Sequence, residues 1–136
     1  MLKLIVGVKG TGKTKMLIES ANAALESTDG CVVCIEKGTK LIHEIKYQAR
    51  LLDADEYAIS GAASLYGFVA GIYASNHDVT HVFIDSALKI CDNNIPEFAD
   101  LVDKLADFGE KKGIAFFITS SIAQEELPDR LAKYIG

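Results

Sequence analysis

The sequence GVKGTGKT, at Gly7–Thr14, lies between two segments of different hydrophobic period. Before it, Leu2–Val6 is a short apolar run that predicts a strand. After it, Lys13–Ser27 repeats its apolar residues on one helical face and predicts a helix. A strand that passes through a glycine-rich turn into a helix is typical of parallel crossover units. This stretch therefore points to an α/β fold.

The same alternation continues along the chain. Apolar runs predict further strands at Cys31–Glu36, His81–Asp85 and Ile114–Thr119, with a short extra strand at Tyr57–Ile59. Segments of helical period predict helices at Thr39–Leu52, from a cap at Ser60 through Ile72, at Pro96–Lys112 with Gly113 as the stop, and at Leu127–Ile135. Glycines 67 and 71 suggest close packing of their helix. We expect one domain, residues 1–136, built as a three-layer α/β/α fold around a mostly parallel five-stranded sheet.

The glycine-rich stretch matches the pattern G-x-x-x-x-G-K-[ST] at every fixed position. Glycines let successive backbone N–H groups turn inward toward phosphate oxygens, and the positive end of the following helix attracts the same anion. We expect Lys13 to contact the β and γ phosphates of a nucleotide and the Thr14 hydroxyl to bind Mg²⁺. The expected nucleotide contacts are Gly7, Val8, Lys9, Gly10, Thr11, Gly12, Lys13, Thr14 and Lys15.

Two other strands end in polar side chains that fit a phosphate site. His81–Asp85 is an apolar strand ending in a carboxylate, the form of a Walker B segment, so Asp85 is the expected second magnesium ligand. The last strand ends in the hydroxyls of Thr119, Ser120 and Ser121. Thr119 and Ser120 are favoured as groups that reach the γ-phosphate or the attacking water, although a plain helix cap gives the same pattern.

These motifs, in this order, resemble the additional-strand division of the P-loop NTPases, which includes RecA-like and AAA-like proteins. The resemblance covers nearly the whole chain, and small bacterial proteins of this kind are sometimes labelled pilus-retraction ATPases. It implies a parallel sheet in which the strand ending at Thr119 lies between the Leu2–Val6 strand and the His81–Asp85 strand. The acidic and histidine boxes of the hexameric pilus motors are not found in this sequence.

The groups that would accelerate hydrolysis are harder to find. In many members of that division a Glu follows the Walker B Asp, but here Ser86 and Ala87 follow Asp85. RecA-like proteins carry the corresponding Glu at the end of the second strand, so the resemblance makes Glu36 the candidate base, against the alternative of an exposed strand-end carboxylate. Arg130 is the candidate cation in cis, and Arg50 could serve a neighbouring subunit; both are also compatible with an ordinary surface role.

Three functions are compatible with these motifs. The first is a Mg²⁺-dependent ATPase or ATP-dependent switch that hydrolyses slowly. The second is a nucleotide-sensing interaction protein that does not hydrolyse ATP, and the third is a small-molecule or nucleoside kinase, although no Arg-rich lid is visible. ATP is preferred over GTP because no N-K-x-D stretch occurs. ATP and ADP are the expected ligands, and a protein partner or a homo-oligomer stays open.

Composition excludes several other classes of protein. A formal net charge of −5 disfavours nonspecific binding to nucleic acid or to anionic membranes. No apolar run is long enough for a membrane span and no export signal is recognisable, so we expect a cytoplasmic protein. Cys31, Cys34 and Cys91 are an odd number and are expected to be unpaired thiols. The first two lie on one predicted strand with side chains on opposite faces, which disfavours a zinc or redox pair.

Overall fold

A five-stranded sheet forms the centre of the computed structural model, which describes all 136 residues. The strands are β1 (Leu2–Gly7), β2 (Cys31–Glu36), β3 (Arg50–Asp53), β4 (Val79–Ile84) and β5 (Ala115–Ser121). Their order in the sheet is β1-β5-β4-β2-β3, and every neighbouring pair is parallel. The last strand of the chain thus lies between β1 and β4, as the resemblance implied.

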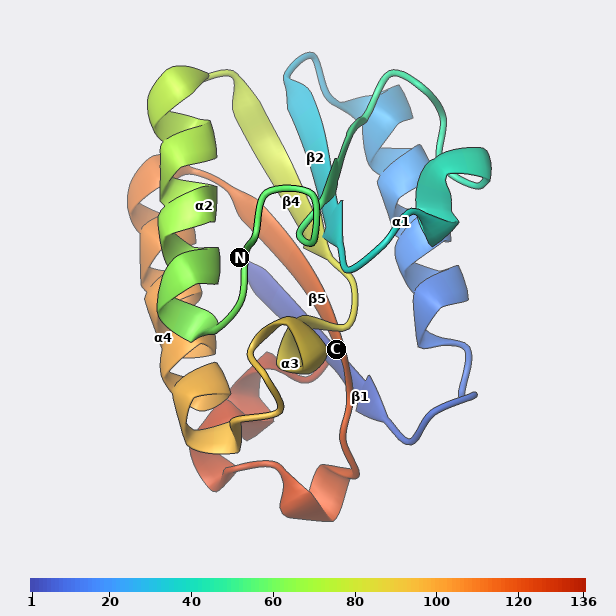
Figure 1. Ribbon diagram of the computed structural model, residues 1–136. Coiled ribbons are helices and arrows are strands. Elements are labelled where there is room, and N and C mark those ends of the chain that lie inside the picture. The colour runs from blue at the N-terminus through green and yellow to red at the C-terminus, as the bar shows by residue number, and fades with distance from the viewer.

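Helices cover both faces of this sheet, which confirms the three-layer α/β/α arrangement. Helix α1 (Lys13–Ser27) packs on one face, and helices α2 (Ala62–Ser75) and α4 (Ile95–Lys112) pack on the other (Figure 1). The remaining elements are short: the single turn α3 (Ala87–Ile90) and the 3₁₀ helices η1 (Lys40–His43), η2 (Gln124–Glu126) and η3 (Asp129–Tyr134). None of the helices combines the length and apolar composition that a membrane span needs.

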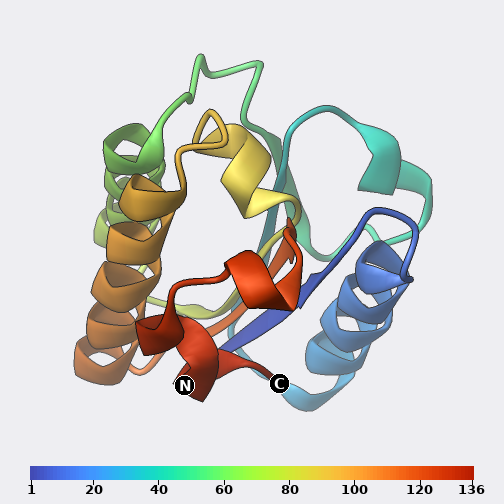
Figure 2. The same ribbon diagram turned by 90° about the horizontal axis from the view of Figure 1, so that it is seen from below.

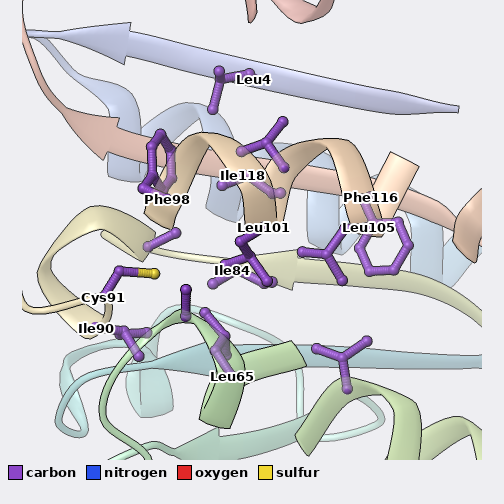
Figure 3. Packing of buried hydrophobic residues seen from close by; sticks show 14 of the residues in the cluster. Leu4, Leu65, Ile84, Ile90, Cys91, Phe98, Leu101, Leu105, Phe116 and Ile118 are labelled. Atoms are coloured by element: carbon purple, nitrogen blue, oxygen red, sulfur yellow. The ribbon is translucent and has the colours of Figure 1, made fainter. Parts of the chain in front are cut away.

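The larger part of the core lies between the sheet and helices α2 and α4. Figure 3 shows the strand residues Ile84, Phe116 and Ile118 beside Phe98, Leu101 and Leu105 of α4, and all of these side chains are almost fully buried. Alternating strand residues face the other side, where Ile5, Phe83 and Phe117 pack with Leu17 of α1. Burial of both faces explains why the strands read as nearly continuous apolar runs in the sequence.

Helix α4 begins and ends where its sequence signals predicted, within a residue. The side chain of Asn94 accepts a hydrogen bond from the backbone N–H of Glu97 at 3.1 Å, and Pro96 occupies the first turn. Gly113 ends the helix with a φ of 72°, a left-handed conformation that glycine adopts at little cost.

The predicted helix at Thr39–Leu52 is wrong. Only η1 is helical there, and the segment continues as a loop into β3, which pairs with β2 from Val33↔Arg50 to Glu36↔Asp53. Leu41, Ile45 and Ala49 are buried on the α1 side, so the helical spacing did mark the inward-facing residues. Backbone pairing with β2 outweighed local helix propensity at Arg50–Leu52, and no side-chain cap forms at Thr39, where the helix was expected to begin.

Three smaller expectations about the elements are also wrong. Tyr57–Ile59 is a turn rather than a strand, since β3 supplies the fifth strand. Gly61 precedes α2 as the cap, while the Ser60 hydroxyl donates to the Asp92 carboxylate. A methyl group at Gly67 or Gly71 would meet open space, so these glycines do not mark close packing. The short closing helix predicted at Leu127–Ile135 does form, as the 3₁₀ helix η3, and its end is followed by a bridge between Ile135 and Leu4 of β1.

The cysteine prediction is confirmed. Cys31, Cys34 and Cys91 are all free thiols, and Cys34 and Cys91 are buried. Burial is the largest cause that raises the pKa of each buried thiol, to about 12. A thiol with so high a pKa stays protonated and is a poor nucleophile or metal ligand.

Candidate functional site

The carboxyl ends of β1, β5 and β4 lie side by side, and each contains or leads into a predicted site residue. The glycine loop, Gly7–Thr14, connects β1 to α1; Thr119 lies in the last part of β5; and Asp85 directly follows β4. Figure 2, which views the molecule from this side, shows the three segments together at one edge of the sheet. Sheet order therefore gathers motifs that are far apart in the sequence.

The glycine loop is tightly curled. Gly12 has a φ of 82° immediately before α1, which favours glycine at this position. At Gly7 a side chain would clash, because an added Cβ would lie 2.8 Å from the Thr11 hydroxyl oxygen. That hydroxyl donates to the carbonyl of Val8 at 2.9 Å and closes the turn. Both glycines are thus required by the shape of the loop.

The loop and the first turn of α1 leave a run of backbone donors without an acceptor in the protein. No N–H group from Val8 to Lys15 donates a hydrogen bond to any backbone or side-chain acceptor, and the first that does is Met16, to the carbonyl of Gly12 at 3.2 Å. A helix start accounts for only part of this run. Consecutive N–H groups at a helix start form an anion-binding surface, which suits a phosphate.

Beside this anion-binding surface, Lys13 supplies a positive charge and Thr14 supplies a hydroxyl that can bind a metal ion. The Lys13 ammonium lies over the loop, where it donates to the Val8 carbonyl at 2.9 Å and to the Thr11 hydroxyl at 3.4 Å. The Thr14 hydroxyl lies 3.3 Å from both carboxylate oxygens of Asp85, although the two residues are 71 positions apart. The structure therefore brings together the two residues that the sequence predicted as magnesium ligands.

Those two groups fit magnesium better than they fit zinc. No cluster of three or more His, Cys, Asp or Glu side chains could hold a metal ion by itself. Mg²⁺ commonly takes one or two protein oxygens and completes its shell with water and substrate phosphates. One hydroxyl and one carboxylate beside an anion-binding loop match that donor set.

Thr119 contributes to the site by holding the carboxylate of Asp85. Its buried hydroxyl donates to the Asp85 carboxylate at 2.7 Å and accepts from the Ser86 N–H at 2.9 Å. Ser120 was predicted to reach the phosphate site, but it is fully buried, accepts a hydrogen bond from the N–H of Leu88 and does not line the cavity. Ser121, the hydroxyl that the sequence favoured least, is exposed and lines the cavity. Strand alternation explains this difference between adjacent residues.

The structure gives Glu36 a structural role instead of a free carboxylate. It is 7% exposed, and its two oxygens accept hydrogen bonds from the backbone N–H groups of Leu41 at 2.8 Å and Lys40 at 3.2 Å. Burial raises the pKa of this carboxyl, with smaller opposing effects from those N–H groups. Glu36 does not line the cavity, so its predicted role as the base loses geometric support.

Neither arginine lies at the site. Arg130 pairs with Asp100 at 2.7 Å and Asp103 at 2.9 Å, both on α4, and does not line the cavity. The expectation that it approaches the site in cis is therefore not met. Arg50 is exposed at the start of β3, rather than at the end of a helix as predicted. No arginine of this chain faces the loop.

A cavity of about 500 Å³ opens beside the glycine loop and is strongly basic. Five lysines line it, and Asp85 is the only carboxylate among its lining residues. The lining consists of Lys9, Gly10, Gly12, Lys13, Thr14, Lys15, Lys40, Asp85, Ser86, Leu88, Lys89, Asn93, Thr119 and Ser121. Lys40, Lys89 and Asn93 were missed by sequence reasoning because they follow strand ends at no fixed spacing from a motif.

The sequence matches no protein-family model and no curated protein. The case for a function therefore rests on the residues and geometry of this cavity.

Proposed function

We propose that this protein binds ATP together with Mg²⁺ at the glycine loop and hydrolyses it slowly. The observation that carries the proposal is the run of N–H groups from Val8 to Lys15 that have no acceptor in the protein, beside the paired side chains of Thr14 and Asp85. ATP is favoured over GTP on the sequence ground that a guanine-specific N-K-x-D stretch does not occur.

Each part of the loop has a distinct task in this proposal. The free N–H groups donate to the phosphate oxygens, and Lys13 exchanges its hydrogen bonds to Val8 and Thr11 for the β and γ phosphates. Thr14 and Asp85 hold Mg²⁺, which when bound supplies positive charge to the oxygens of the β and γ phosphates. Thr119 keeps the Asp85 carboxylate in place.

The same geometry argues that hydrolysis is slow. Asp85 is the only carboxylate that lines the cavity, and it is already hydrogen bonded to Thr14 and Thr119. No second carboxylate is placed to accept the proton of an attacking water, so that proton would go to an oxygen of the γ-phosphate itself. No arginine faces the phosphates, and arginines at such sites contribute on the order of 10³ to 10⁵ in rate.

A non-hydrolysing nucleotide switch is the second candidate, favoured by the connection between Asp85 and β5. Thr119 joins the carboxylate of Asp85 to the backbone of Ser86, and Ser120 binds the N–H of Leu88. A change at the phosphates would thus act on the segment that leads into α3. The switch differs from the ATPase in one measurement, because it binds ATP and releases no phosphate.

The test compares wild type with Lys13→Ala and with Lys111→Ala, which removes the same charge from the exposed end of α4. Binding of ATP and ADP with Mg²⁺ is measured by calorimetry, and phosphate release is followed for hours. We expect Lys13→Ala to lose ATP binding while Lys111→Ala keeps it. No nucleotide binding by folded wild-type protein would refute the proposal, and binding without phosphate release would favour the switch.

A further inference from the structure

Two of the lysines that line the cavity lie outside the glycine loop and the first turn of α1. Lys40 begins η1 after β2, and Lys89 lies in α3 after β4. Neither has a carboxylate within ion-pair distance, whereas Lys37, Lys46 and Lys111 are paired with acidic side chains. An unpaired cation beside an anion-binding loop is available to a phosphate.

Helix α3 is built so that Lys89 is its one exposed side chain. Ala87, Leu88 and Ile90, the other residues of this single turn, are buried in the core. The turn is fixed at its start, where the N–H groups of Ser86 and Leu88 donate to the hydroxyls of Thr119 and Ser120. A short helix held in this way presents Lys89 to the cavity from a rigid base.

The position of α3 indicates which phosphate Lys89 would meet. Figures 1 and 2 place α3 on the α2 and α4 side of the sheet edge, whereas the start of α1 lies on the other side. In the proposed complex the glycine loop would hold the phosphates at the start of α1, and Thr14 and Asp85 would hold the Mg²⁺ that neutralises the terminal phosphates; Asp85 lies four residues before Lys89. A cation that approaches from the α3 side therefore faces the terminal phosphate.

On these grounds we propose that Lys89 binds the γ-phosphate of ATP and makes the site prefer ATP to ADP. This inference rests on the proposed function, because it requires a nucleotide at the glycine loop. It deepens that proposal by assigning the discrimination between the two nucleotides to one side chain. Lys40, which comes from the opposite side of the sheet through η1, is not needed for this discrimination.

The experiment measures dissociation constants for ADP and for the non-hydrolysable β,γ-imido analogue of ATP, both with Mg²⁺. Lys89→Gln removes the charge and keeps a side chain of similar reach. We expect it to weaken binding of the analogue about tenfold at low salt, the size of a charge-assisted hydrogen bond, and to leave ADP binding unchanged. Lys89→Arg should restore the preference, and Lys111→Gln should match wild type.

The outcomes separate this inference from the proposed function. If wild type binds neither nucleotide, both fall. If wild type binds both nucleotides and Lys89→Gln weakens them equally or not at all, the ATP-binding proposal stands and the role of Lys89 is refuted. Urea unfolding of each variant checks that the fold is kept, as expected for an exposed side chain whose backbone N–H still donates to Ser86.

Discussion

At the scale of single residues, Asp85 is the point on which the site depends. Its carboxylate receives hydrogen bonds from Thr14 and Thr119, and Thr119 in turn accepts from the backbone of Ser86. The sequence predicted that Thr14, Asp85 and Thr119 belong to one site. The sequence could not identify their roles. Strand register and the turn after β4 decide which hydroxyl of the Thr119–Ser121 run faces Asp85, and neither can be read from local sequence.

Thr119→Val tests the importance of that hydroxyl, since valine keeps the shape and removes both hydrogen bonds. The partly buried N–H of Ser86 loses its acceptor, and Asp85 loses a donor. We expect the free energy of unfolding in urea to fall by about 1–3 kcal/mol and Mg²⁺-dependent ATP binding to weaken. Ser121→Ala is the matched control at an exposed hydroxyl. Equal stability of the two variants would show that Thr119 does not hold this segment.

Glu36→Gln tests whether Glu36 is structural or catalytic. Burial raises the pKa of its carboxyl in the folded protein above the ordinary value of 4.5. The folded state therefore holds this proton more tightly than the unfolded chain, and its contribution to stability is fully present below pH 4.5 and is lost as pH rises through the folded pKa. We expect wild type to gain stability relative to Glu36→Gln as pH falls from about 7 toward 4.5 in urea unfolding experiments.

Phosphate release from the same variant gives a second measurement. With both Glu36 oxygens bound to the backbone of η1, we expect Glu36→Gln to retain the wild-type rate. A variant that binds ATP normally but releases no phosphate would instead restore Glu36 as the base.

At the scale of elements, the sequence predicted best where local signals and tertiary packing agree. Helix α4 has an Asn cap, a proline in the first turn and a glycine stop, and its predicted and observed bounds nearly coincide. The Thr39–Leu52 segment has inward-facing apolar residues but no side-chain cap at Thr39, and its last three residues pair with β2 as part of β3. Helix α3 has only four residues, which is too short for hydrophobic periodicity to reveal.

The glycines of α2 provide a test at this scale. Because Gly67 and Gly71 are helical and have open space where a side chain would be, we expect Gly67→Ala and Gly71→Ala each to stabilise the protein by about 0.4–1 kcal/mol, measured by urea unfolding. Gly109→Ala in α4 is the contrasting variant, because its Cβ would lie 2.7 Å from the Ile114 carbonyl oxygen. It should destabilise the protein. A stabilising effect at Gly109, or a loss of stability at both α2 positions, would contradict this account.

At the scale of the whole molecule, the order of the strands gathers lysines from separate segments into one basic cavity. The chain carries a net charge of −5, yet five lysines line one cavity. Overall composition could not predict this local excess, because the lysines come from three segments that meet only at the carboxyl edge of the sheet. The resemblance to P-loop proteins did imply the place of β5 between β1 and β4, and with it the meeting of the loop, Thr119 and Asp85.

The bridge between Ile135 and Leu4 has a consequence for aggregation. β1 is one edge strand of the sheet, but Ile135 forms a bridge to it at Leu4, and the N–H of Gly136 donates to the Leu4 carbonyl at 3.1 Å. The opposite border, β3, is only four residues long and carries Arg50 and Asp53 at its ends. Short, charged or covered borders resist the addition of strands from other molecules. Fibril-like association through this sheet is therefore disfavoured on both sides.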